Sequence, residues 1–132
     1  MPDHPNAVLV RGLLDAFAAG DITAVERHLH ADCVWRFPGR RGALAGEHRG
    51  RDAVFAFFGR VVALTEGTFA MDVTDVVAGD DRAVVLFRGC GSRPDGRTLD
   101  NPTSLVIRLE DGAAVEVDEF VWDLEAVESF WS

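Results

Sequence analysis

The chain has 132 residues, of which 48% are hydrophobic and 27% charged, a balance typical of one globular domain with a single core. Its net charge is −9 at pH 7, and the scattered acidic residues argue against nucleic acid and membrane surfaces as partners. Arginine supplies every residue of the Lys plus Arg total, and tyrosine is absent. Schiff-base chemistry, a P-loop lysine and a tyrosine acid are therefore excluded.

The start of the chain contains no apolar run long enough for a signal peptide or a membrane span. The two cysteines, Cys33 and Cys90, fall inside separate predicted strands. Cysteines in such positions are typical of buried thiols in a reducing compartment. We therefore expect a cytoplasmic protein without a disulfide, formed by one domain over residues 1–132.

A first helix is predicted from the start of the chain to Gly20. Asp3 is expected to cap it, and Pro5 lies in its first turn, where proline is tolerated. Leu13 and Phe17 are four residues apart and therefore share a face. We expect that face to point inward.

Asp21 is placed to cap a second, shorter helix. This helix carries apolar residues on one face, namely Ile22, Val25 and Leu29. A strand over residues 33–37 follows, and its period of two puts Trp35 and Phe37 on the same side. We expect that side to line a cavity.

Residues 40–50 combine glycines with charges, so no regular structure is predicted there. His48 is the one group in this segment that titrates near neutrality, and it is expected to be solvated, with a role above the pocket as the alternative. A third helix begins at Arg51, because apolar residues recur at spacings of three and four as far as Leu64. Gly67 follows its last turn.

Strand-forming composition and intervening turn residues then predict three consecutive hairpins. The four strands are Thr68–Ala78, Arg82–Ser92, Thr98–Glu110 and Ala114–Asp123. A last amphipathic turn over residues 124–132 is expected to dock Val127 and either Phe130 or Trp131 on the sheet.

The turns also predict which residues pair. We expect a two-residue turn at Asp111-Gly112 and a loop centred on Pro94 and Asp95. Alternate residues from Leu99 to Leu109 are the more apolar set, so they define the inner face. On these registers the inner face carries three rows: Arg88, Asn101 and Trp122; Leu86, Thr103 and Phe120; Val84, Leu105 and Asp118.

The same registers leave an apolar set on the outer face of the sheet. Its members are Val85, Phe87, Val106, Val115, Val117 and Val121. Such a face needs a cover, and the helices are already used on the inner face. We therefore expect a homodimer formed through the outer face.

Four segments, in their order and spacing, resemble the nuclear transport factor 2-like superfamily, specifically its SnoaL-like and ketosteroid isomerase-like branch. The segments are Ala18–Asp21, His30–Gly39, Gly46–Val54 and Asp111–Phe120. The resemblance implies an α+β fold, a cone-shaped curved antiparallel sheet wrapped on three N-terminal helices, also described as a cystatin-like roll. It also implies an interior that holds small apolar molecules, and dimers formed through the sheet.

Ketosteroid isomerases are similar in frame but need a carboxylate base and two oxyanion donors. Those positions correspond to Phe37, Leu13 and Leu105 here. None of these side chains can transfer a proton or stabilise an enolate, so steroid isomerisation by that mechanism is not expected.

The inferred cavity combines apolar walls with a few polar groups, as small-molecule sites usually do. The apolar residues are Leu13, Phe17, Trp35, Phe37, Val84, Leu86, Leu105, Phe120 and Trp122. The polar residues are Arg88, Asn101, Thr103 and Asp118. A small apolar molecule is the expected partner.

Asp118 is the candidate catalytic residue, because a carboxylate between Val84 and Leu105 would be desolvated and its pKa raised. SnoaL-like polyketide cyclases are similar in using a sheet carboxylate for acid/base work. Two alternatives stay open: Asp118 lies at the mouth of the cavity, solvated or paired with an arginine, or Asp123 is the functional carboxylate.

Arg88 and Asn101 are candidates for orienting ligand oxygens, with a salt bridge of Arg88 to Asp100 or Asp118 as the alternative. His28 and His30 diverge on a helix and with Asp32 make a poor metal site, so they are expected to be structural or exposed. Neither a metal nor a cofactor is expected.

Together these observations favour a cofactor-independent isomerase or cyclase that acts on a polyketide, terpenoid or related apolar substrate. A non-catalytic ligand-binding protein is the first alternative. An epoxide hydrolase-type enzyme is another, although only one pocket carboxylate is evident. A dimeric interaction module would instead have its cavity filled by Trp35, Phe37 and Trp122.

Overall fold

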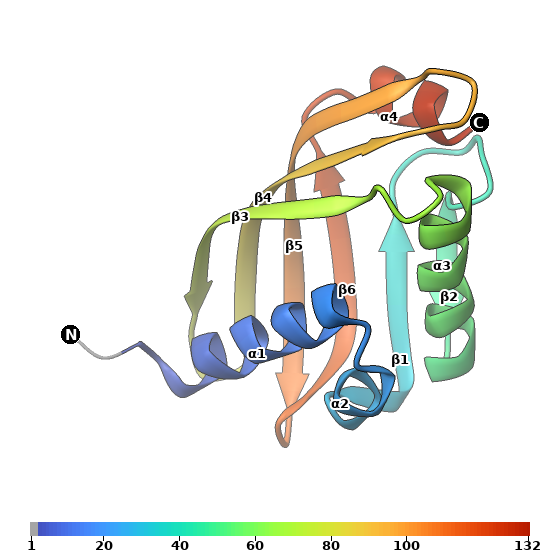
Figure 1. The fold of residues 1–132 in the computed structure, drawn as a ribbon. Coiled ribbons are helices and arrows are strands. Elements are labelled where there is room, and N and C mark those ends of the chain that lie inside the picture. The colour runs from blue at the N-terminus through green and yellow to red at the C-terminus, as the bar shows by residue number, and fades with distance from the viewer. Residues whose placement is uncertain (1–2) are drawn as a thin grey trace.

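The computed structural model describes residues 3–132 and has an α+β fold (Figure 1). Its elements in chain order are α1 (Pro5–Ala19), α2 (Ile22–Arg27), β1 (Leu29–Phe37), β2 (Gly46–Arg49), α3 (Arg51–Leu64), β3 (Ala70–Ala78), β4 (Arg82–Ser92), β5 (Thr98–Glu110), β6 (Ala113–Val121) and α4 (Leu124–Trp131). The six strands form one sheet in the order β2-β1-β6-β5-β4-β3. Every neighbouring pair is antiparallel except β1 and β6, which run parallel.

The sheet curves around the helices to form a cone (Figure 1). Helix α1 contacts β3 and β4, and α3 contacts β1 and β2, so the N-terminal helices lie on the concave side. Helix α4 lies at the end of the sheet where the β4–β5 hairpin turns (Figure 1). Arg93 and Arg97 of that hairpin donate hydrogen bonds to the carbonyl groups of Phe130 and Ser129, both at 2.8 Å. The expected cone-shaped arrangement is confirmed.

The ends of the first two helices follow from local capping chemistry. The N-cap of α1 is His4, not Asp3 as predicted, because the ring of His4 accepts a hydrogen bond from the Asn6 backbone N–H at 3.1 Å. Asp21 caps α2 as predicted and accepts from the Ala24 backbone at 3.2 Å. The predicted shared face of α2 is wrong, since Val25 is buried, Ile22 is 59% exposed and Leu29 belongs to β1.

The region around β1 contains more strand than the sequence pattern indicated. Strand β1 begins at Leu29 rather than at Cys33, and its ladder with β6 is irregular between Leu29 and Val34. The predicted loop over residues 40–50 contains β2, which pairs with β1. His48 of β2 is therefore buried, not solvated, and its Nε2 lies 2.8 Å from the carbonyl oxygen of Leu44.

Both predicted turns exist, but the registers that lead away from them differ by one residue from the prediction. The Asp111-Gly112 turn pairs Glu110 with Ala113 as expected, and then a bulge shifts the ladder between Arg108 and Leu109. The β4–β5 loop joins Ser92 to Thr98 and is centred on Asp95 rather than between Pro94 and Asp95. Because side chains alternate along a strand, each one-residue slip exchanges the two faces of β4 and β6 relative to β5.

The outer face therefore differs from the predicted one. Four residues of the predicted outer set are buried: Val85, Phe87, Val115 and Val117. Val106 is the member of that set that lies on the outer face, where it pairs with Val84 of β4 and Asp118 of β6. The large exposed apolar side chains on the outer side of these strands are instead Leu86, Phe120 and Trp122. Trp122 is 84% exposed.

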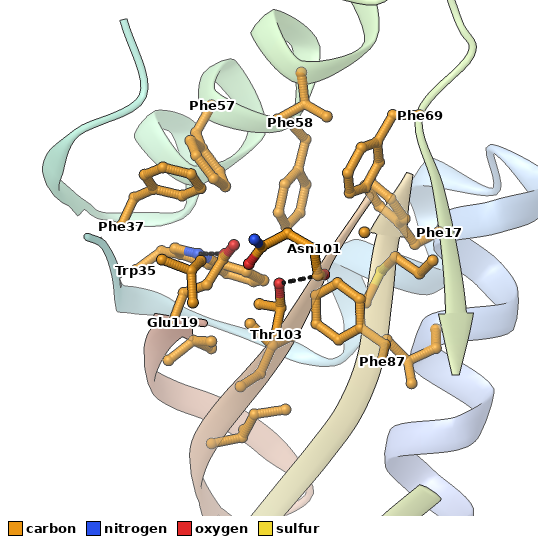
Figure 2. A pocket seen from close by; sticks show the side chains of 18 of the residues that line it. Phe17, Trp35, Phe37, Phe57, Phe58, Phe69, Phe87, Asn101, Thr103 and Glu119 are labelled. Atoms are coloured by element: carbon orange, nitrogen blue, oxygen red, sulfur yellow. Dashed lines mark hydrogen bonds between the residues drawn. The ribbon is translucent and has the colours of Figure 1, made fainter. Parts of the chain in front are cut away.

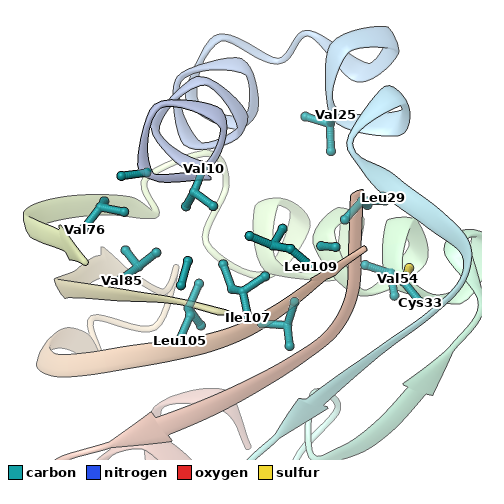
Figure 3. Packing of buried hydrophobic residues seen from close by; sticks show 14 of the residues in the cluster. Val10, Val25, Leu29, Cys33, Val54, Val76, Val85, Leu105, Ile107 and Leu109 are labelled. Atoms are coloured by element: carbon teal, nitrogen blue, oxygen red, sulfur yellow. The ribbon is translucent and has the colours of Figure 1, made fainter. Parts of the chain in front are cut away.

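Two clusters of buried side chains form the core. The first lies between α1, α2, α3 and the sheet and includes Val10, Val25, Val54, Val85 and Ile107 (Figure 3). The second surrounds α4 and includes Phe37, Leu44, Phe57, Phe130 and Trp131. Within residues 3–132, no helix has the length and apolar character needed to cross a membrane.

Candidate active site in the cone

A cavity of about 80 Å³ lies between the two buried clusters and is lined by both. Its wall is almost entirely apolar (Figure 2). The polar exceptions are Asn101, Thr103 and Glu119. Sites for drug-sized ligands measure about 300–1,000 Å³, so this cavity suits a molecule considerably smaller than a typical drug.

Seven of the residues predicted from the sequence line this cavity: Leu13, Phe17, Trp35, Phe37, Asn101, Thr103 and Leu105. These seven residues lie on α1, β1 and β5, and their inward orientation follows from the periodicity of apolar residues within each element. The other six predicted residues, on β4 and after the bulge in β6, do not line the cavity: Val84, Leu86, Arg88, Asp118, Phe120 and Trp122. Their predicted inward placement is wrong because each one-residue slip in register turned them outward.

The charged groups among these outward residues have structural partners. Asp118 accepts a hydrogen bond from Arg36 at 3.0 Å, and the Nε of Arg88 donates to Asp100 at 2.8 Å. Asp123, the rival carboxylate, caps α4 by accepting from the Ala126 backbone at 3.0 Å. None of these three carboxylates faces the cavity.

Glu119 is the carboxyl group that does face it. The residue pairs with Leu105 on the inner side of the sheet, and its side chain accepts a hydrogen bond of 3.1 Å from the indole Nε1 of Trp35. Glu119 is half-buried and is one of the residues that line the cavity. Burial raises the pKa of Glu119 to about 7, although the hydrogen bond from Trp35 opposes the shift.

Two polar groups of β5 lie on the same face as Glu119. The amide oxygen of Asn101 accepts a hydrogen bond from the Trp122 backbone N–H at 3.1 Å, so the orientation of its buried side chain is fixed. Its NH₂ group makes no hydrogen bond to residues 3–132 and can donate to a ligand. The hydroxyl of Thr103 donates to the Asn101 carbonyl at 3.1 Å and keeps its oxygen lone pairs as acceptors.

Aromatic rings surround the carboxyl group on the side of α3 (Figure 2). The ring centroid of Trp35 lies 5.5 Å from that of Phe57 and 5.2 Å from that of Phe58. Phe37 and Phe57 are 5.8 Å apart. We call these four residues the aromatic wall.

Several residues that line the cavity were not identified from the sequence. The predicted registers imply that Glu119 points outward, because the bulge near Val115 leaves no local sequence signal. Phe57 and Phe58 belong to the apolar stripe predicted for the helix that begins at Arg51, but periodicity alone does not show that such a stripe borders a cavity. Phe87 followed the misplaced register of β4 and lies inside, on the cavity wall.

The chemistry available in this cavity is proton transfer and hydrogen bonding. A carboxyl group with a pKa near neutrality can act as an acid or a base at physiological pH. The Asn101 amide and the Thr103 hydroxyl can bind ligand oxygens or N–H groups. Among the described residues, no arginine or histidine lines the cavity.

Comparisons with known proteins agree with this architecture. The SnoaL-like domain family matches residues 10–117. An uncharacterised protein of Mycobacterium tuberculosis is 32% identical over 132 residues, which is the full length of both chains. Solved structures of the cystatin-like and nuclear transport factor 2-like folds also superpose on this chain.

Two of the similar structures are informative. Bal32a, from a soil-derived mobile gene cassette, has a TM-score of 0.91 and 34% identity, with 96% of each chain covered. A protein of Jannaschia sp. CCS1 assigned as a SnoaL-like polyketide cyclase has a TM-score of 0.80 and 22% identity, covering 100% of this chain and 97% of its own. At that identity the likeness concerns the fold. The family match and the full-length relative show that this chain belongs to the SnoaL-like family.

Proposed function

We propose that the protein binds a small, largely apolar metabolite inside the cone and that Glu119 transfers a proton to or from it. The observation that carries this proposal is a desolvated carboxyl group on the wall of an apolar cavity. The reaction class is a cofactor-independent isomerisation or cyclisation, and the cavity of about 80 Å³ suits small ketones of polyketide or terpenoid type rather than complete polyketide or terpenoid skeletons. The polyketide cyclase assignment of a structural neighbour supports the same class.

The polar residues suggest a division of roles. In the ionised form, Glu119 removes a proton from a carbon next to a ligand carbonyl group; the electron pair of the broken C–H bond forms a C=C bond, and the π pair of the C=O bond moves onto the carbonyl oxygen. The NH₂ group of Asn101 donates a hydrogen bond to that oxygen as negative charge develops there. Protonated Glu119 then returns the proton to another atom of the same ligand.

Proton transfer of this kind is detectable without knowledge of the natural substrate. Small cyclic ketones are incubated with the protein in D₂O, and NMR follows the exchange of hydrogen for deuterium next to the carbonyl group. The wild-type protein is expected to accelerate exchange for ketones that bind. Glu119→Gln, which keeps the size of the side chain, is expected to reduce exchange to the buffer rate.

Asp118→Asn serves as the matched control, since Asp118 pairs with Arg36 outside the cavity. This variant is expected to exchange at the wild-type rate. Ketones that bind to the wild-type protein without accelerated exchange would overturn the catalytic proposal and favour a ligand-binding protein.

The other two functions considered from the sequence have less support. An epoxide hydrolase-type reaction needs two carboxylates and an arginine at the site, whereas within residues 3–132 only Glu119 supplies a charged group to the cavity. A filled-cavity interaction module needs Trp122 inside the cone, and this side chain is exposed.

A further inference from the structure

The cavity has a pronounced charge asymmetry. Glu119 is the one ionisable side chain on its wall in the described part of the chain. When this group is ionised, its partner is the neutral N–H of Trp35, and no cationic side chain of residues 3–132 lines the cavity to balance its charge. A buried carboxylate without a counter-ion is costly, and a ligand can supply the missing charge.

The aromatic wall adds a second preference. Trp35 donates to Glu119 and stands next to Phe57 and Phe58, so several rings lie close to the carboxyl group (Figure 2). The faces of aromatic rings carry partial negative charge and attract ammonium groups, most strongly where water is excluded. The protein as a whole carries a net charge of −9, which also concentrates cations around it.

We propose that the ligand of this cavity is a small hydrophobic amine, whose ammonium group pairs with Glu119 and whose hydrocarbon part packs against the aromatic wall. This inference rests on the proposed function and narrows its substrate class to ketones that also carry an amino group, so that one oxygen of the Glu119 carboxylate pairs with the ammonium group and the other can still accept the proton. A carboxylate or phosphate ligand would meet a like charge and, among the described lining residues, no arginine or histidine. A neutral ligand would fill the cavity but leave the charge of Glu119 unpaired.

The pairing has a defined pH dependence. An ammonium ligand binds to ionised Glu119, so the proton must leave this group before or during binding. Affinity for an amine should therefore rise as pH increases through neutrality and level off once Glu119 is ionised. His48 of β2 is a further titratable group close to the aromatic wall: its ring lies 4.6 Å from that of Phe57, and its nitrogens face the Leu44 carbonyl group and Arg60.

Cyclopentylamine and cyclopentanol test the proposal, because they have the same shape and differ in charge. Binding is measured by NMR from the shift of the Trp35 indole N–H signal, which reports on the partner of Glu119. At about pH 8 the amine is expected to bind roughly tenfold more tightly than the alcohol, as for a hydrogen bond between charged groups. Glu119→Gln is expected to remove this preference while alcohol binding persists.

The outcomes separate the two proposals. Equal affinity for amine and alcohol, or amine affinity that does not rise between about pH 6 and pH 8, would overturn the amine assignment and leave the proposed function in place. Failure of both compounds to shift the Trp35 signal would count against a ligand site in the cone and hence against both. If Glu119→Gln does not fold, the pH series on the wild-type protein decides alone.

Discussion

Glu119 shows how one position on a strand decides the properties of a side chain. Its neighbours in sequence, Asp118 and Phe120, point to the outer face, where Asp118 pairs with Arg36 and Phe120 is exposed. Glu119 points inward, opposite Leu105, and burial raises its pKa to about 7. Two adjacent carboxylates therefore have different roles, one in a surface ion pair and one in an apolar cavity.

The raised pKa of Glu119 predicts a pH-dependent loss of stability. The folded state holds a proton on this group between the ordinary pKa of 4.5 and about 7, whereas the unfolded state does not. The free energy of unfolding should therefore fall as pH rises through that range, by at most about 3 kcal/mol from this group. Glu119→Gln cannot titrate and should lack this fall.

Urea unfolding of both proteins at several pH values gives the comparison. Other titrating groups are common to the two proteins, so the difference between the curves isolates Glu119. Parallel curves from about pH 4.5 to 7 would show that the carboxyl group is not desolvated.

At the scale of elements, α4 and the segment after β1 close the cone together. The carboxylate of Glu128 on α4 accepts hydrogen bonds from the backbone N–H groups of Arg40 and Arg41, at 2.9 and 3.0 Å. Gly39 has a φ of +90°, and a Cβ there would lie 2.8 Å from the Glu128 carboxylate. Glycine therefore permits both the turn and the close approach of α4.

Glu128→Ala is expected to lower the melting temperature by a few degrees, because it leaves two backbone donors of the turn without their acceptor. Ser129→Ala is the matched control, since Ser129 is exposed on the same helix and only its carbonyl group, not its hydroxyl, has hydrogen-bond partners among residues 3–132. Differential scanning calorimetry measures both. Equal melting temperatures for the two variants would show that Glu128 does not hold the turn.

The elements also show what the sequence could predict. Helix α3, the β4 and β5 boundaries and the Asp111-Gly112 turn follow from periodicity and turn chemistry. The bulge near Val115 is different, because it accommodates one extra residue through three-dimensional packing and leaves no pattern in the chain. Because this one bulge is not predictable, the sequence points to Asp118 as the candidate carboxylate, whereas the structure places Glu119 at the cavity.

At the scale of the whole molecule, the outer sheet face carries large exposed apolar side chains. Leu86 and Phe120 lie in one row across β4, β5 and β6, and Trp122 follows Phe120 along the chain. The Arg88–Asp100 and Arg36–Asp118 pairs put both signs of charge on the same face. We propose that a second copy covers this face, since opposite charges and apolar groups on one patch allow it to pair with itself.

Analytical ultracentrifugation is expected to find a dimer for the wild-type protein and a monomer for Trp122→Glu. Trp122 is exposed, so the substitution removes interface area without opening the core. Val8→Glu is the control, because Val8 is an exposed apolar residue on α1, away from this face, and the variant should stay dimeric. A monomeric wild-type protein would contradict the proposed interface.

The sequence could predict the cone because apolar periodicity and the resemblance are distributed over the whole chain. It could predict the α1, β1 and β5 walls of the cavity, since each depends on alternation within a single element. The inward residues of β4 and β6 depend on registers between elements, and one residue of error there reverses inside and outside.

The most direct test of this account is the pKa of Glu119 in the wild-type protein. ¹³C NMR follows the side-chain carboxyl signals through a pH titration, and comparison with Glu119→Gln assigns the signal. We predict a midpoint of about 7, as expected for a desolvated carboxyl group on the cavity wall. A midpoint near the ordinary value of 4.5 would mean that Glu119 is solvated, and would contradict its proposed role in acid/base chemistry.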